Sequence, residues 1–326
     1  MVRLFQRNII LQALLIVVLM ALLWGRQLTT PPAMVAGEHP AVLYGLLCRW
    51  MEHTPRMAVV LAMLLSLLEG VLLNVLMADT GLSSQNSLLP TFLFVGLCGA
   101  GATTLTPMLL VALCATLALL QLKVHDNLLT ISASRLCTAT ALIGLATLFF
   151  QPAIALLLTY LFIAIGYRLY SWKDWMILLL GIMVPYVPLM AFHYLHGGFA
   201  TWWSETTASL AAIHFGLGTA DTPHRIGSIV LTALFLWSLV YSAIHIGEHP
   251  IVWQRNAAAI LFVSVAALVM LLYYPLWPMQ MQALAIPASF SLYLLMAGRS
   301  HYSRPYRKQW IYDLMLITFI LCTLVC

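Results

Sequence analysis

The feature that most restricts the fold of this chain is a succession of apolar runs with almost no charge inside them. A helix that crosses a bilayer needs about 20 apolar residues, and fewer where the bilayer is thin. Hydrophobic residues make up 63% of the chain and charged residues 8%, whereas soluble domains carry roughly 25% charged residues. Lipid must therefore be most of the solvent of this protein. The runs lie at about residues 9–25, 57–77, 88–100, 103–121, 136–150, 153–169, 175–195, 226–246, 257–273, 282–298 and 309–325.

From these runs we expect one all-α transmembrane domain over residues 1–326, a polytopic helical bundle of nine to eleven spans, with eleven preferred. The count is least certain between residues 88 and 169, where short runs form hairpins that one kinked helix could replace. The first run resembles a signal peptide but lacks a small-x-small cleavage site, so we predict that it is the first span. The six cysteines show no paired spacing and predict no disulfide framework.

Lys and Arg are unevenly divided between the predicted loops. The external segments hold only Arg26, Arg49, Arg56 and Arg225. Cytoplasmic loops of membrane proteins carry an excess of these residues. The pattern therefore predicts a cytoplasmic N-terminus and an external C-terminus, which would be periplasmic in a bacterial inner membrane. It also places the basic residues near anionic lipid and excludes nucleic acid as a partner. The predicted cytoplasmic segments hold Arg3, Arg7, Lys123, Arg135, Arg168, Lys173, Arg255, Arg299, Arg304, Arg307 and Lys308.

Two predicted external loops, residues 26–56 and 196–225, are longer than hairpin turns. In the first, polar residues recur at steps of three or four while leucines and Trp50 fill the other side, as in an amphipathic interfacial helix. The second contains the pair Trp202 and Trp203, which suits the headgroup level. We expect both loops to form interfacial collars. The stretch 273–287 is predicted to be a short external turn.

The tetrapeptide Gly-Glu-His-Pro occurs twice, at residues 37–40 and 247–250. In the second copy His245, Glu248 and His249 spell H-x-x-E-H, a spacing found in some zinc peptidases. Pro250 follows at once, and no third ligand is close in sequence, as a zinc site would require. The favoured interpretation is a polar helix end, and neither a metal nor another cofactor is predicted.

The first external loop also carries a candidate chemical site. Carboxylates can act as general bases, and guanidinium groups bind phosphate. The competing interpretation is a solvated loop whose arginines contact lipid phosphates. The candidate bases are Glu38 and Glu52, and the candidate phosphate-binding residues are Arg49, Arg56, His39 and His53.

Glu69 lies inside the second apolar run, away from both of its ends. An ionisable residue at such a position is a functional hypothesis by default. Ser66 and Asn74 are its expected partners, and the alternatives are a proton relay or a protonated structural residue. Apart from Asp313 and Arg168, which lie near the ends of the runs 309–325 and 153–169, no second carboxylate and no arginine falls within a predicted span, which counts against ion-coupled transport.

Four segments carry a resemblance to an uncharacterised integral-membrane family of Bacteroidota. They are "NSLLPTFLFVGLCGA" at 86–100, "GLATLFFQP" at 144–152, "WKDW" at 172–175 and "LGIMVPY" at 180–186, and the similarity extends over about residues 60–300. The family implies no activity.

The layout more distantly resembles the GT-C membrane glycosyltransferases, which have a cytoplasmic N-terminus and interfacial helices in their external loops. The resemblance implies a polyprenyl-phosphate sugar donor, with Glu38 as the closest match to the catalytic acid and Arg49, Arg56 and Arg225 holding phosphate. The usual aspartate directly after the first span is missing, because residues 26–37 contain no acid.

Three functions follow as expectations. The first is a lipid-handling enzyme of glycosyltransferase type, in which Glu38 or Glu52 deprotonates an acceptor hydroxyl at the outer face and arginines stabilise the leaving phosphate. The second is a non-catalytic membrane subunit or scaffold of a cell-envelope assembly, with a protein partner. A small-molecule transporter is third.

Overall fold

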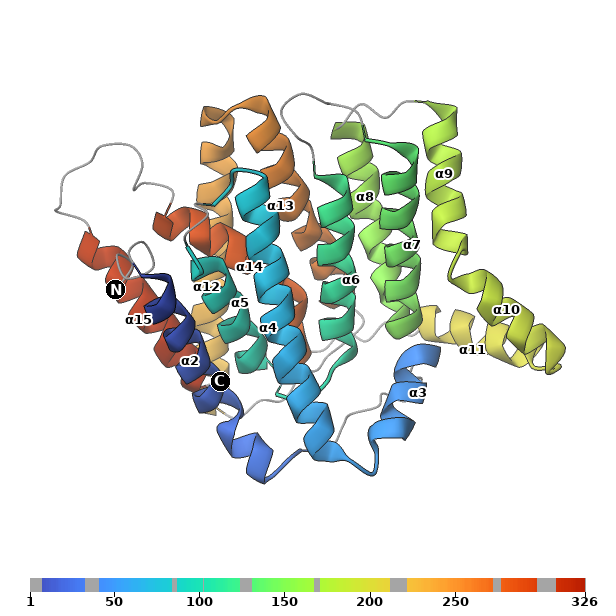
Figure 1. Ribbon diagram of the computed structural model, residues 1–326, viewed down its shortest axis with the longest axis horizontal. Coiled ribbons are helices and arrows are strands. Elements are labelled where there is room, and N and C mark those ends of the chain that lie inside the picture. Colours follow the sequence, from blue (N-terminus) through green and yellow to red (C-terminus); the bar gives the residue numbers. More distant parts are fainter. Residues whose placement is uncertain are drawn as a thin grey trace.

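The computed structural model of the chain describes residues 8–32, 41–83, 87–101, 103–123, 131–166, 171–211, 222–271, 277–297 and 309–325. Every regular element in these ranges is a helix, so the prediction of an all-α fold is confirmed for them (Figure 1). The helices are α2 (Ile9–Thr29), α3 (Val42–Met51), α4 (Pro55–Asp79), α5 (Leu89–Gly101), α6 (Pro107–Leu122), α7 (Ala133–Phe149), η1 (Gln151–Ile154), α8 (Ala155–Gly166), α9 (Trp172–Met183), α10 (Tyr186–Leu195), α11 (Phe199–Ala211), α12 (Thr222–His245), η2 (Ile246–Glu248), α13 (Ile251–Leu271), α14 (Trp277–Ala297) and α15 (Gln309–Val325).

Local sequence signals explain where several of these helices begin. Prolines occupy the first turns of α4 and α6, where a missing N–H costs no helical hydrogen bond. The Thr106 hydroxyl accepts a hydrogen bond from the Leu109 backbone N–H at 3.3 Å and caps α6. Ser132 caps α7 in the same way, through the backbone N–H of Arg135 at 3.4 Å.

Each predicted apolar run coincides with a helix or a bent pair of helices, but fewer of these helices are by themselves long and apolar enough to cross a bilayer. In the described residues, four segments are long and apolar enough to cross a bilayer: α2, α4, Ile229–Glu248 and Ile251–Met270. The bent pair α9 and α10, which meet at 45°, makes a fifth. The structure therefore shows a helical membrane protein with four or five candidate spans.

Two helices, α5 and α14, lie at the centre and pack against each other. Every residue of α5 is buried, as is every residue of α14 from Met281 to Met296. The Gln282 side chain joins them, because its amide donates to the carbonyl oxygen of Cys98 at 3.3 Å and its side-chain oxygen accepts from the Thr106 hydroxyl. The prediction of an external turn over residues 273–287 is therefore wrong from Trp277 onward, where the buried helix begins.

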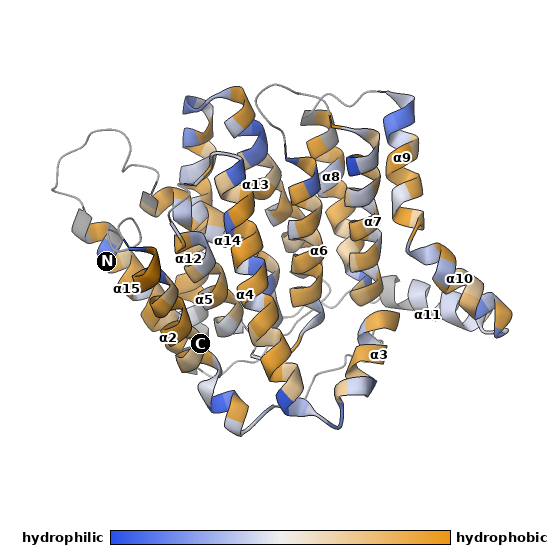
Figure 2. Ribbon diagram, viewed as in Figure 1, coloured by the Kyte–Doolittle hydropathy of each residue, from blue (hydrophilic) through white to orange (hydrophobic). Residues whose placement is uncertain are grey.

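The apolar side chains of α2, α4 and α12 that face away from this centre are exposed, as lipid-facing positions would be. Figure 2 shows apolar residues along most of the helical bodies, with hydrophilic residues gathered toward the two ends of the bundle. This distribution matches an apolar band between two polar boundaries.

The bundle has two distinct ends (Figure 1). At one, here called the Lys123 end, α4 and α6 finish and α7, α9 and α13 begin, so that Lys123, Arg135 and Lys173 lie there. At the other, called the α3 end, α2 finishes and α4 begins, with α3 between them. The predicted charge asymmetry thus corresponds to the two ends of the bundle, while the orientation in a membrane stays a prediction.

Candidate functional site

The helix expected in the first external loop is present and is held in place by two long-range hydrogen bonds. The buried Tyr44 hydroxyl of α3 donates to the Leu105 carbonyl oxygen at 3.1 Å. The Trp24 indole N–H near the end of α2 donates to the Thr103 carbonyl oxygen at 3.1 Å. Both acceptors lie in the connection between α5 and α6. This connection therefore holds both α2 and α3 in place. The opposite face of α3 is open, with Trp50 76% exposed.

The turn from α3 to α4 carries four of the predicted site residues. Arg49, Glu52, His53 and Arg56 are all exposed, and none forms a hydrogen bond or ion pair with another described residue. The Thr54 N–H donates to the Met51 carbonyl oxygen at 2.9 Å in this turn, so the expected helix ends before Glu52, and Arg56 belongs to α4. The structure therefore places these four side chains at the surface on either side of the turn, without a polar partner among the described residues.

Burial distinguishes Cys48, one turn before Glu52, from these exposed groups. Partial burial raises the pKa of its thiol, while a hydrogen bond with Tyr44 acts in the opposite direction and is the smaller influence. The thiol is therefore a weak nucleophile at neutral pH.

Three predicted site residues are not placed beside this turn. Glu38 and His39 lie outside the described residues. Arg225 belongs to α12, whose first residues have no described side chains. Helix α12 packs on α14 and α15, whereas α3 packs on α4 and α7.

The outer part of the predicted run 175–195 and the start of the second predicted external loop together form an aromatic hairpin, defined as α10, the turn at Gly197 and α11. The hairpin projects from the bundle at the α3 end (Figure 1). The His193 ring stacks on Trp202 with centroids 5.4 Å apart, and Trp202 is buried with its indole N–H unpaired among the described residues. Tyr194 and Leu195 are 77% and 81% exposed. This hairpin starts at the Pro185 bend, where the sequence predicts a kink, and residues 212–221 of the same loop lie outside the described part.

Glu69 occupies the middle of α4 and is completely enclosed by protein, with 0% exposure. Neither of its carboxylate oxygens has a hydrogen-bond partner among the described residues. The expected partners do not serve it, because the Ser66 hydroxyl donates to the Met63 carbonyl oxygen at 2.9 Å and Asn74 Oδ1 is itself buried and unpaired. The structure thus places an acid in the bundle without the donors that would stabilise its charge.

The surroundings of Glu69 come from α5 and α6. The buried thiols of Cys98 and Cys114 lie within electrostatic reach of its carboxyl group. One residue further along α4, the Thr91 hydroxyl donates to the Gly70 carbonyl oxygen at 2.9 Å and fastens α5 to α4. A Cβ at Gly70 would lie 3.1 Å from the Thr91 methyl group, so the two helices are in close contact here.

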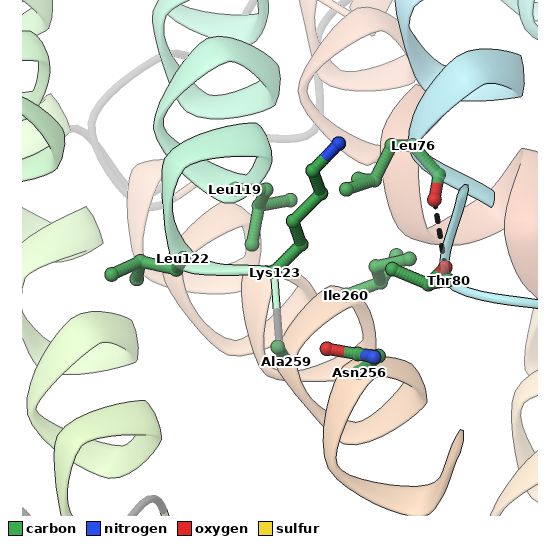
Figure 3. Close-up of a pocket in the computed structure, with 8 residues that line it drawn as sticks. All are labelled: Leu76, Thr80, Leu119, Leu122, Lys123, Asn256, Ala259 and Ile260. Atoms are coloured by element: carbon green, nitrogen blue, oxygen red, sulfur yellow. Dashed lines mark hydrogen bonds between the residues drawn. The ribbon is translucent and has the colours of Figure 1, made fainter. Parts of the chain in front are cut away.

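A cavity at the Lys123 end is a feature that the sequence did not indicate. It is a small, partly open hollow of about 230 Å³, a volume that includes the solvent space at its mouth, and it lies between α4, α6 and α13 (Figure 3). The ion pair between Lys123 Nζ and Asp79 Oδ2, at 2.5 Å, joins the ends of α6 and α4 beside it. Its lining residues are Leu76, Thr80, Leu119, Leu122, Lys123, Asn256, Ala259 and Ile260.

The second Gly-Glu-His-Pro copy lies where α12 ends. The helix changes to the short 3₁₀ helix η2 after His245, so the H-x-x-E-H residues do not share one continuous helix. The His245 ring bonds to the Tyr241 carbonyl oxygen at 2.9 Å, and His249 stacks on Trp253 at 3.8 Å. Throughout the described residues, no three His, Cys, Asp or Glu side chains gather as a metal site would need.

Comparison with known proteins identifies no relative of this chain. No protein-family model matches the chain, and neither curated proteins nor solved structures contain a match to it.

Proposed function

We propose that this protein is a lipid-handling protein of the bacterial inner membrane, and that the turn between α3 and α4 binds the phosphate of a membrane lipid. The observation that carries the proposal is the pair of exposed guanidinium groups, Arg49 and Arg56, which have no carboxylate partner in the described part of the chain, with exposed Trp50 beside Arg49 in the sequence. Guanidinium groups bind phosphate through paired, charge-assisted hydrogen bonds. Trp50 supplies an amphipathic ring suited to the headgroup boundary.

The aromatic hairpin supports the same assignment. It lies at the α3 end, and its exposed Tyr194, Leu195 and Trp203 give it the composition of an interfacial element. Helix α3 and the hairpin lie on the same side of the bundle in Figure 1, so two amphipathic segments border this part of its α3 end. A lipid headgroup held by the arginines would thus keep its tail against apolar helices.

The chemistry proposed for this lipid is glycosyl transfer from a polyprenyl-phosphate donor at the outer face. Glu52 takes the proton of the acceptor hydroxyl, the hydroxyl oxygen bonds to the sugar, and the sugar–phosphate bond breaks. Arg49 and Arg56 stabilise the negative charge on the departing phosphate. Glu52 is the described carboxylate closest in the chain to both arginines, and Glu38 is the alternative base. The eleven-span, GT-C-like arrangement and the cytoplasmic N-terminus belong to this proposal.

Native mass spectrometry of the detergent-purified protein tests the phosphate site. We expect a polyprenyl-phosphate adduct on the wild type that the double variant Arg49→Ala, Arg56→Ala loses. The matched control is Arg135→Ala, Lys173→Ala, which removes two exposed basic side chains at the Lys123 end and should keep the adduct. An adduct that survives on the α3-end variant, or only bulk phospholipid on all three proteins, would contradict the proposal.

A transfer assay tests the base separately. Glu52→Gln should abolish glycosyl transfer while the lipid adduct persists, because the amide cannot accept the hydroxyl proton but leaves the arginines in place. Full transfer by this variant would exclude Glu52 as the base and leave Glu38.

The projecting hairpin also favours a second candidate, a non-catalytic subunit of an envelope assembly. Exposed aromatic side chains on a protruding element can serve as protein contacts. This function predicts a stable partner that co-purifies and is lost when Tyr194 and Leu195 are replaced by serine. Isolation of the wild type as a lone monomer under mild solubilisation would argue against it.

A further inference from the structure

Glu69 is separated from bulk solvent but lies on the same face of α4 as the cavity at the Lys123 end. Leu73, Leu76 and Thr80 follow Glu69 at steps of four, three and four residues, the spacing that keeps side chains on one helical face. Leu76 and Thr80 line the cavity. At 1.5 Å per residue, Leu76 lies about 10 Å along the helix axis from Glu69.

The part of α4 between Glu69 and the cavity is mostly apolar. Leu73 is fully buried one turn from Glu69 and closes the face between the acid and Leu76. Asn74, beside Leu73 in the chain, has a buried and unpaired side-chain oxygen. Unpaired oxygens on Glu69 and Asn74 therefore lie on the segment of α4 that leads to the cavity.

The groups that could hold or share a proton here are few. From α5 and α6, the elements packed on this part of α4, the described titratable groups near Glu69 are the thiols of Cys98 and Cys114. On α2 and α3, which also contact α4, the described titratable groups Arg26, Cys48 and Arg49 lie at the opposite end of the bundle. Lys123 and Asp79 stand beside the cavity and pair with each other.

We propose that Glu69 is a proton-binding site inside the bundle, and that it exchanges its proton with the Lys123 end through this cavity when Leu73 and Leu76 move aside. In the closed arrangement the carboxyl group is neutral, because an enclosed carboxylate without donors is strongly disfavoured. On opening, the carboxyl O–H bond breaks and water that enters from the cavity takes the proton. Return of a proton from water restores the neutral acid, and the leucines close over it.

This exchange links the proton on Glu69 to the packing of α4 against α5 and α6. The charged form needs water and therefore the open arrangement, whereas the neutral form is compatible with the closed one. A change in proton occupancy thus shifts the balance between two packings. The site is independent of the phosphate site at the α3 end, so Glu69→Gln should retain the lipid adduct.

Carbodiimide labelling with peptide mapping tests the proposal on the full-length protein in lipid. Carbodiimides modify protonated carboxyl groups, and dicyclohexylcarbodiimide dissolves in the apolar phase whereas a water-soluble carbodiimide does not. We expect the lipophilic reagent to label Glu69 more than the exposed Glu52, and the water-soluble reagent to reverse this order. Glu69→Gln must lose the label at this position. Labelling of Glu69 by the water-soluble reagent as fast as that of Glu52 would show that the acid is not enclosed.

The route is tested with the two leucines. Leu76→Ala and the milder Leu73→Val should raise water-soluble labelling of Glu69 several-fold, because each widens the path from the cavity. Leu64→Ala is the matched control, since Leu64 lies on the same helix but is 53% exposed on its outer side. Equal labelling of all three variants, or an increase in the control alone, would overturn the route. Thermal unfolding of each variant confirms that the increase does not come from loss of the fold.

Discussion

Gly181 lies where α9 passes closest to α7, and replacing it with alanine should loosen this helix pair. A Cβ at this position would overlap Thr140 Oγ1 and approach the Cys137 carbonyl oxygen to 2.8 Å. The Thr140 hydroxyl donates to the carbonyl oxygens of Leu136 and Cys137 at 3.0 Å each. If the added methyl group forces this hydroxyl to rotate, the hydrogen bonding is lost and the fold is destabilised by about 1 kcal/mol. The backbone contact with Cys137 must also open, and overpacking of this kind costs about 1–3 kcal/mol.

Against these costs, alanine gains about 1 kcal/mol of helix propensity over glycine. The net loss in the free energy of unfolding is therefore about 1–3 kcal/mol, measured by reversible unfolding in mixed detergent–lipid micelles. The matched control is Gly25→Ala in α2, where a Cβ would meet nothing within 4 Å and where stability should stay equal or rise. Because Thr140→Ala removes the overlapping oxygen, its combination with Gly181→Ala should cost less than the sum of the two changes. Equal stability of the Gly181 and Gly25 variants would refute the close approach of α7 and α9.

Three further outcomes follow from single contacts. Gln282→Leu leaves the buried Thr106 hydroxyl without its acceptor and should lower the free energy of unfolding by about 1–3 kcal/mol, measured in the same micelles. Because burial raises the pKa of Cys48, its alkylation at neutral pH should be slower than that of a free thiol and should accelerate as the pH rises. Timed maleimide labelling measures this rate. A rate equal to that of a free thiol would contradict the burial of the Cys48 side chain. Lys123→Met removes the ion pair with Asp79. Because both partners are partly exposed, we expect the free energy of unfolding to fall by at most about 1 kcal/mol. A larger fall would contradict the view that solvent screens this pair.

The helical content could be predicted from the sequence because its strongest signal, apolar length between breakers, is local. The run predicted at residues 88–100 corresponds to α5, Leu89–Gly101, and the kink predicted at Pro185 corresponds to the bend between α9 and α10. The same signal could not distinguish a lipid-facing helix from an enclosed one, because both are apolar on every side. This is why residues 277–287 were assigned to a turn although they begin the buried α14: their prolines suggest breaks, whereas one lies in the first turn and Pro287 is accommodated within the helix.

The candidate sites show the same limit. The steps of three and four between Arg49, Glu52 and Arg56 predicted that one helix would carry them on a shared face, but α3 ends at Met51 and Arg56 belongs to α4, so only the exposure of these side chains is confirmed. Whether they line a cleft or stand at the surface depends on α5, α6 and α7, which are distant in sequence. Glu69 was noticeable as an acid in an apolar run, but its lack of donors is a property of its neighbours in space. The cavity beside Leu76 had no sequence signal, because mostly ordinary apolar residues from three helices line it.

The enclosure of α5 and α14 has a consequence for the order of assembly. Each helix is surrounded by protein, and α5, with 13 residues, is shorter than a bilayer is thick. Such a segment gains little from lipid and must be held by neighbours such as α4 and α2. Its partner α14 is synthesised much later, after α13. The ribosome has therefore made α2 to α13 before the centre can close around α5.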